Sequence, residues 1–247
     1  MEPARRASRL LVAPLAPVSI AEILVVPDGP LAQIPIEILV PRADGVPWGA
    51  TRRIIYGPSA SVLLALSRSA RWRVWQRSVL AVGNPSAPPQ TIGLTPREYF
   101  TPAPLPYAQQ EARAVRDRFR TGGADLLLGP AATVERWLAL RRLPLRAELV
   151  TLSACETALG RRIRGEGTVG LAHAFLAAGA RGVVVTFWRV SDRSAADFMR
   201  EFYGEVAGHT SPAAALLTVR KRWIAERGAR AHPSRCAPFV LVAGPDL

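Results

Sequence analysis

The stretch LVTLSACET, residues 149–157, decides the fold of this chain. Its first four residues are apolar or β-branched, which predicts a short strand buried in a sheet. Cys155 follows this strand, and functional side chains in parallel sheets gather at the carboxyl ends of strands. A lone cysteine after a strand is often a small buried side chain instead. Its position alone therefore leaves Cys155 either a nucleophile or part of the core.

Strand and helix patterns alternate on both sides of this stretch. Apolar, β-branched runs predict further strands at residues 21–26, 52–56, 78–82, 125–128, 181–188 and 239–242. Apolar residues at helical spacing predict helices at residues 57–68, 107–119, 133–140, 168–179, 192–206 and 213–226. Strands separated by helices of this length predict a parallel α/β sandwich.

The domain organisation is read from the same pattern. Residues 1–84 are expected to form a small N-terminal subdomain and to supply the first strand of the main sheet. Residues 85–106 are rich in proline and lack periodicity, which predicts an exposed loop. Residues 107–247 form the larger remaining part. No clean linker divides them, so the whole chain is expected to be one domain.

The charge balance raises the question of nucleic acid, because the net charge is +13 at pH 7. All 32 basic residues except Lys221 are arginines, and they are scattered along the chain. No aromatic platform or helix-turn-helix pattern accompanies them. A solvated basic surface is the favoured interpretation, nucleic-acid binding is disfavoured, and a basic interaction module remains a competing hypothesis.

Cofactor, metal and membrane sites find little support in the composition. Cys155 and Cys236 lie far apart and form neither a disulfide framework nor a CxxC motif. Three histidines are too few for an ordinary zinc cluster, so no metal and no cofactor are expected. No apolar run reaches the ~18 residues that span a bilayer. A cytoplasmic protein without membrane contact is the expectation.

Several segments together resemble one known family. The match is carried by residues 147–160, 165–167, 170–180, 183–192 and 232–242, and upstream by residues 25–31 and 56–61. These segments closely resemble CHAT-domain proteins, which are caspase-like, clan CD-type cysteine peptidases often attached to tetratricopeptide repeats. The resemblance implies a three-layer α/β/α sandwich with a mostly parallel sheet. It also implies that Cys155 is the nucleophile, that a polypeptide is the substrate or partner, and that repeats precede this region in a longer gene.

The resemblance further implies a histidine that this chain lacks. In the family, a Cys–His dyad cleaves the peptide, and its histidine lies in a His-Gly motif that ends the strand before the cysteine strand. Here the helix at residues 133–140 is followed by residues 141–146 and then at once by the cysteine strand. The His-Gly strand has no counterpart. We therefore expect a degenerate or inactive peptidase-like module, with an active cysteine endopeptidase as the alternative.

Substitutes for this histidine are few. His173 lies on an apolar helical stripe, His209 lies in a loop between helices, and His232 begins a His-Pro turn before the last strand. None is expected at a strand end beside the cysteine strand, so a rescued dyad would need His173, His209 or another chain. The carboxylate of Glu156 would raise the pKa of the neighbouring thiol.

Two residues after the next strand are substrate-pocket candidates by resemblance. Trp188 and Asp192 occupy the place where caspase-like folds build the pocket for the residue that precedes the cut. The structural interpretation of Asp192 is a helix cap, and that of Trp188 is a packed aromatic ring.

Loss of a strand also predicts a sheet order. If the strand at residues 149–152 pairs directly with the strand at residues 78–82, no backbone group is left unpaired in the core. The order by first residue is then 125, 78, 149, 182 and 239, with the helix at residues 133–140 as the crossover.

Overall fold

The computed structural model describes most of the chain. Described are residues 6–15, 17, 19–41, 45–67, 79–83, 90–91, 99–100, 105–119, 124–128, 147–152, 172–173, 175–177, 179–188 and 190–245. The predicted helix at residues 133–140, Cys155 and Glu156 lie outside these residues.

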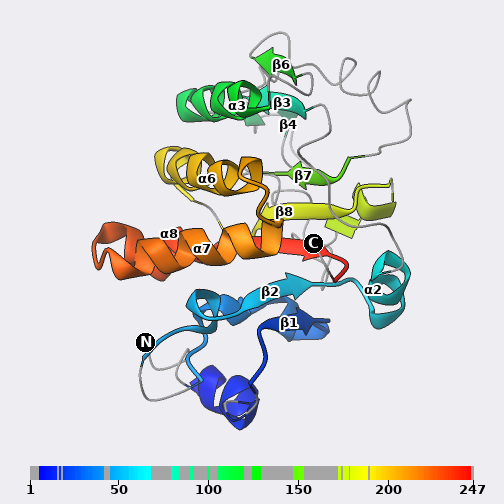
Figure 1. Cartoon of the computed structure of the whole chain (residues 1–247), viewed down its shortest axis with the longest axis vertical. Coiled ribbons are helices and arrows are strands. Elements are labelled where there is room, and N and C mark those ends of the chain that lie inside the picture. The colour runs from blue at the N-terminus through cyan, green and yellow to red at the C-terminus, as the bar shows by residue number, and fades with distance from the viewer. Residues whose placement is uncertain are drawn as a thin grey trace.

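A five-stranded sheet forms the centre of the molecule (Figure 1). Its order is β1-β2-β9-β8-β7, with bounds Glu22–Val25, Arg53–Tyr56, Phe239–Ala243, Gly182–Thr186 and Leu149–Thr151. Three of the four neighbouring pairs are parallel, and only β8 and β9 run antiparallel. The predicted mixed α/β fold with a mostly parallel sheet is confirmed. β1 and β2 belong to the same sheet as β7 to β9.

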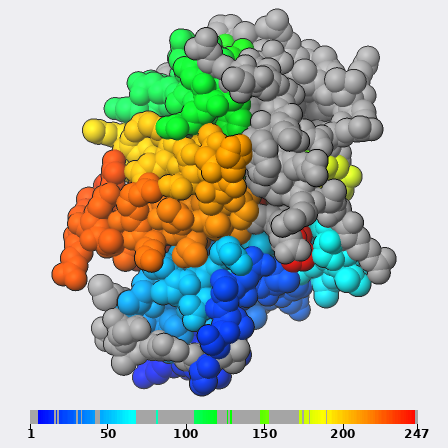
Figure 2. All heavy atoms as spheres, in the orientation of Figure 1, coloured from blue at the N-terminus to red at the C-terminus, as the bar shows by residue number. Residues whose placement is uncertain are grey.

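Alternate residues of the central strands face two different cores, as the two-residue period of a strand requires. Val184 and Leu241 face a core shared with α3 (Pro106–Arg118), α6 (Asp192–Ala207) and α7 (Pro212–Ala225). Val183 and Val242 face the opposite core, which holds N-terminal residues and the helical residues 172–173 and 175–177. Figure 2 shows the side chains of α3, α6 and α7 covering the first face in one continuous layer. Helices on both faces make the sandwich three layers thick.

The expected sheet order is correct in two parts and wrong where they join. β3 (Val79–Gly83) pairs in parallel with β6 (Ala124–Leu128), and β7 pairs with β8, as predicted. The direct pairing of β3 with β7 is not found among the described strands, where these two strands belong to different sheets. α3 contacts both β3 and β6 and also packs against α6. In the described part of the chain, the contact between α3 and α6 thus connects the β3–β6 pair to the main sheet.

The proline-rich segment contains more backbone pairing than its composition predicts. Gln90–Thr91 (β4) and Tyr99–Phe100 (β5) form a short antiparallel pair. Strands of two residues have no side-chain period that could show in the sequence, so this pair within the expected exposed loop could not be predicted.

Helix boundaries follow local capping signals. α2 (Ala60–Ser67) begins after Ser59, whose Oγ accepts the backbone N–H of Val62 at 3.2 Å. The chain continues after α7 through η10 (Ala229–Ala231) and α8 (Pro233–Cys236) into β9. In the described part of the chain, none of the helices combines the length and apolarity that a membrane crossing demands.

Candidate functional site

The carboxyl ends of β7 and β8 lie at one edge of the sheet. The two strands are parallel, with Thr151 opposite Val184, so the residues that follow each strand leave the sheet on the same side. Cys155 comes four residues after Thr151, and Trp188 comes two residues after β8 ends at Thr186. This edge, which we call the carboxyl edge, is the place where chemistry would be expected.

Trp188 joins the carboxyl edge to α8. Its indole Nε1 donates to the backbone oxygen of Ser234 at 3.1 Å. The ring packs, partly buried, against the core on the helix side. A buried indole needs a hydrogen-bond acceptor, and Ser234 provides one. This geometry fits a packed aromatic residue, and the substrate-pocket role stays a prediction.

Asp192 does not cap its own helix, which corrects the sequence interpretation. Ser191 is the N-cap residue of α6, and its Oγ accepts the backbone N–H of Ser194 at 3.3 Å. The Asp192 carboxylate instead accepts the backbone N–H of Tyr107 at 2.9 Å, in the first turn of α3. Leu105, the N-cap residue of α3, makes no capping bond with its own side chain. Asp192 therefore caps a neighbouring helix, 85 positions away in sequence.

His232 is the histidine that the structure brings to the carboxyl edge, and sequence reasoning missed this. It is the N-cap residue of α8, and its Nδ1 accepts the backbone N–H of Ser234 at 3.2 Å. Ser234 is also the residue whose carbonyl receives the Trp188 indole. Pro233 at the first helical position is the signal that could have predicted a helix start rather than a simple turn. β8 separates β9 from β7, so the strand that follows α8 lies two strand spacings, about 10 Å, from the cysteine strand.

His209 lies at the other end of α6. It follows the helix in a left-handed conformation, with φ of 70°, and is exposed. The 16 residues of α6 begin at the carboxyl edge. They carry the chain about 24 Å along the helix axis before His209 is reached.

His173 lies in the helical segment that precedes β8. Its neighbours Ala172 and Leu176 are buried in the core on the face opposite α6. The segment ends at Gly179, just before β8 begins, so it leads to the amino end of that strand. His173 itself is half-buried. The expectation of a packed or partly exposed side chain is confirmed.

α6 is fixed to β7 by a partly buried hydrogen bond. Tyr203 Oη donates to Thr151 Oγ1 at 2.6 Å. Burial raises the pKa of Tyr203 well above its usual value, because the phenolate would lose its hydration. The phenol therefore stays a neutral donor at physiological pH.

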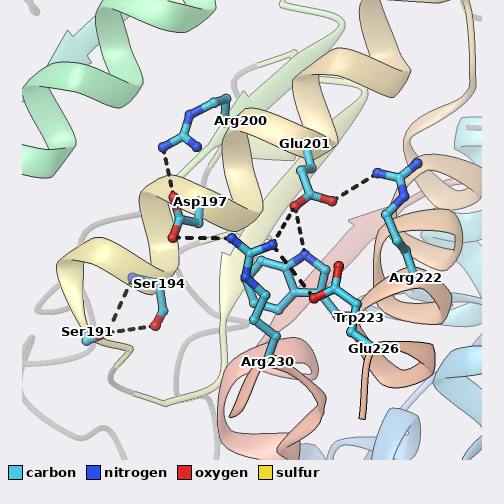
Figure 3. A network of polar contacts seen from close by, with 9 residues as sticks. All are labelled: Ser191, Ser194, Asp197, Arg200, Glu201, Arg222, Trp223, Glu226 and Arg230. Atoms are coloured by element: carbon cyan, nitrogen blue, oxygen red, sulfur yellow. Dashed lines mark hydrogen bonds and ion pairs between the residues drawn. The ribbon is translucent and has the colours of Figure 1, made fainter. Parts of the chain in front are cut away.

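On its outer side, α6 is tied to α7 and η10 by the polar network in Figure 3. The Glu201 carboxylate accepts bonds from Arg222 at 2.9 Å, the Trp223 indole at 3.0 Å and Arg230 at 3.3 Å. The Arg230 guanidinium also lies 5.1 Å from the centre of the Trp223 ring. These charges are largely exposed, so each pair contributes little alone and the network mainly orients the helices.

The second cysteine is a core residue. Cys236 is buried in α8, and burial raises the pKa of its thiol. A protonated, inaccessible thiol is a poor nucleophile. Within the described residues, no group of three or more His, Cys, Asp or Glu side chains could hold a metal ion.

The fold resembles known cysteine proteinases. The Arg specific cysteine proteinase gingipain R superposes with a TM-score of 0.56 and 10% identity, over 98% of this chain and 68% of that chain. The complex of Porphyromonas gingivalis RgpB pro- and mature domains gives a TM-score of 0.52 and 10% identity, over 98% of this chain and 69% of that chain. At this identity the likeness shows the fold alone.

Sequence relatives lie in much longer proteins. Mouse tetratricopeptide repeat protein 28 is 36% identical over 105 residues, which are 42% of this chain and 4% of that protein. Human tetratricopeptide repeat protein 28 is 27% identical over 186 residues, 70% of this chain and 7% of that protein. The chain thus spans less than a tenth of these relatives.

A family model extends across nearly the whole chain. The model of the CHAT domain matches residues 1–142 and 136–244. The caspase-like α/β sandwich and the position of the cysteine strand agree with this match. The chain belongs to the CHAT domain family.

Proposed function

We propose that this chain is a caspase-like CHAT module that keeps the nucleophile position at Cys155 but lacks a histidine able to activate it. It would then act as a pseudoenzyme that binds a polypeptide without cleaving it. The observation that carries this proposal is the state of His232, the histidine at the carboxyl edge.

His232 is held in an unsuitable tautomer. Its Nδ1 accepts the N–H of Ser234, so in the neutral ring the proton must sit on Nε2. The exposed ring atom is therefore an N–H donor, whereas a general base needs a lone pair there. The Ser234 hydroxyl lies 2.7 Å from the same Nδ1. Turning the ring over would break the N-cap of α8.

The other two histidines support the same proposal. His209 lies beyond the far end of α6, and His173 precedes the amino end of β8.

The CHAT match also supports the proposal, because it is divided into two ranges that overlap at residues 136–142. These residues lie just before the cysteine strand, where the resemblance leads us to expect that the His-Gly strand is missing.

A thiol-reactive peptide probe tests the proposal. At pH 7, Cys155 should label no faster than a free thiol of ordinary pKa, because no base withdraws its proton. The matched controls are Cys155→Ala, which identifies the labelled site, and Cys236→Ala, which removes the buried thiol. Intact mass spectrometry gives the rate at each cysteine.

The active alternative predicts a different pattern. Labelling of Cys155 would then exceed that of the free thiol by about a hundredfold or more, as general-base catalysis provides. Loss of that acceleration in His173→Ala, His209→Ala or His232→Ala would identify the base. His232→Asn is the matched variant for His232, since asparagine retains the N-cap but cannot act as a base.

A protein partner is the binding class that the comparisons favour. Proteins named for tetratricopeptide repeats contain the related region, and the fold neighbours are proteinases. We assign this chain to a longer, repeat-containing assembly in which the CHAT module contacts a polypeptide. A protein that binds such a polypeptide and leaves its mass unchanged after prolonged incubation would behave as proposed.

A further inference from the structure

Three polar side chains to which no chemistry has yet been assigned are buried together in the core. Glu37 is 1% exposed, Arg220 is 1% exposed and Tyr56 is fully buried. They come from the short helix η4 (Ile36–Ile38), from α7 and from the end of β2. Burying a charge is costly unless it is paired, so such a cluster calls for an explanation.

The three side chains form a chain of contacts. Tyr56 Oη donates to Glu37 Oε2 at 2.8 Å and accepts the N–H of Ile36 at 2.9 Å. Arg220 Nη2 lies 3.6 Å from Glu37 Oε1 and also donates to the backbone oxygen of Phe239. The carboxylate therefore holds the guanidinium at the first residue of β9.

The bond to Phe239 fills a gap in the sheet. The carbonyl of Pro238 accepts the N–H of Phe187 at 2.9 Å, so it points toward β8. Successive carbonyls in a strand point to opposite sides, and that of Phe239 therefore points toward β2. The described pairing of β2 with β9 covers only Ile55 with Leu241 and Tyr56 with Val242. Arg220 supplies the donor that β2 does not bring to Phe239.

The same cluster reaches the end of β8. The Tyr56 ring lies edge-on to the Phe187 ring, with 5.3 Å between centroids. Phe187 directly follows β8 and precedes Trp188. The cluster therefore contacts the start of β9 through Phe239 and the end of β8 through Phe187, and both lie at the carboxyl edge. Burial raises the pKa of Glu37 despite the opposing effect of Arg220, so keeping this carboxylate charged in the core has a net cost. Stability alone therefore does not explain why the two charges are buried together.

We propose that Arg220 is a positioning residue, aligned by Glu37 and Tyr56, that holds the start of β9 against the end of β8 and so fixes the backbone of the carboxyl edge. This role does not depend on whether Cys155 reacts. It requires that loss of the guanidinium loosens this end of the strands more than the other end.

Hydrogen exchange at two amides of the β8 region tests the proposal in the full chain. The Phe187 amide bonds to Pro238 at the carboxyl edge, and the Gly182 amide bonds to Glu148 at the opposite end. In Arg220→Met, the ratio of the Phe187 rate to the Gly182 rate should rise about tenfold, the effect of losing a bond from a charged donor. Arg220→Lys retains a donor and should restore part of the protection.

Arg181→Met is the matched control, because Arg181 forms an ion pair with Glu148 at 2.8 Å at the far end of the same strand. In Arg181→Met the ratio of the Phe187 rate to the Gly182 rate should fall, because exchange should speed up at Gly182 and not at Phe187. An unchanged ratio in folded Arg220→Met would overturn the proposal, as would equal acceleration at both amides. If Arg220→Met does not fold, Glu37→Gln takes its place: a rise of a few-fold supports the proposal and no rise refutes it.

Discussion

The Asp192 carboxylate accepts the backbone N–H of Tyr107 at 2.9 Å and so connects the first turn of α6 with the first turn of α3. An acidic side chain near a helix N-terminus pairs with otherwise unsatisfied N–H groups and with the positive end of the helix dipole. A residue in the first turn of one helix thereby caps another helix that precedes it in sequence.

Replacing this carboxylate should cost stability. Asp192→Ala is expected to lower the free energy of unfolding by about 1 kcal/mol, the usual effect of losing a cap. Asp192→Asn keeps an oxygen acceptor and should lose less. Urea denaturation measures both, with Asp197→Ala as the control, because Asp197 pairs with exposed Arg200 on the surface of the same helix. Unchanged stability together with weakened peptide binding would restore the substrate-pocket interpretation.

The buried carboxylate of Glu37 should make stability depend on pH. Its pKa is raised above the usual 4.5, mainly by burial. The folded protein therefore holds this proton more tightly than the unfolded chain does. The stabilising contribution is complete below pH 4.5 and is lost as pH rises through the raised pKa.

Glu37→Gln removes this titration while keeping an acceptor for Tyr56. Relative to the wild type, its free energy of unfolding should increase as pH rises from 4.5 toward neutrality. Chemical denaturation at a series of pH values gives the difference. Glu22→Gln, which disrupts a surface pair with Arg53, is the control. A constant difference between Glu37→Gln and wild type over this range would contradict the prediction.

The backbone around Glu37 leaves no room beside it. A Cβ on Gly49 would lie 2.8 Å from the carbonyl oxygen of Glu37 and 2.9 Å from its Cβ. Gly49→Ala should therefore destabilise the protein by about 1–3 kcal/mol through overpacking. Thermal unfolding measures this. Gly228→Ala, whose added Cβ would meet nothing closer than 3.9 Å, is expected to change little.

The bond between Tyr203 and Thr151 can be isolated by a double-mutant cycle. Tyr203→Phe should cost about 1–2 kcal/mol, because it removes a bond and leaves the Thr151 hydroxyl without its Tyr203 donor. Adding Thr151→Val to Tyr203→Phe should cost less than the sum of the single changes. Strict additivity, measured by urea denaturation, would show that the two hydroxyls do not act together.

Local patterns predict most elements of this fold, since periodicity and caps are properties of neighbouring residues. Val183 to Val185 and the Ser59 cap are examples. That β3 and β7 belong to different sheets among the described strands could not be predicted, because strand pairing depends on groups far apart in the chain. The same applies to Asp192, whose bonding partner lies 85 positions away.

The candidate site divides in the same way. The sequence predicts the cysteine strand, Cys155 and the candidate residues after β8, partly through family resemblance. The capping role of His232 depends on a four-residue helix with no apolar period. The burial of Glu37 with Arg220 gives no local signal, because both residues occur in the sequence as ordinary charges.

The place of β9 in the sheet has a consequence for how the protein is made on the ribosome. β9 lies between β2 and β8, although it follows both of them in the chain. Until residues 239–243 leave the exit tunnel, β2 and β8 each expose unpaired backbone N–H and C=O groups on the side that β9 will occupy. Such exposed strands are sites of aggregation during synthesis. A product that stalls before β9 would therefore leave the two strand pairs unconnected within the sheet, and chaperone binding should be concentrated on their open sides until β9 is made.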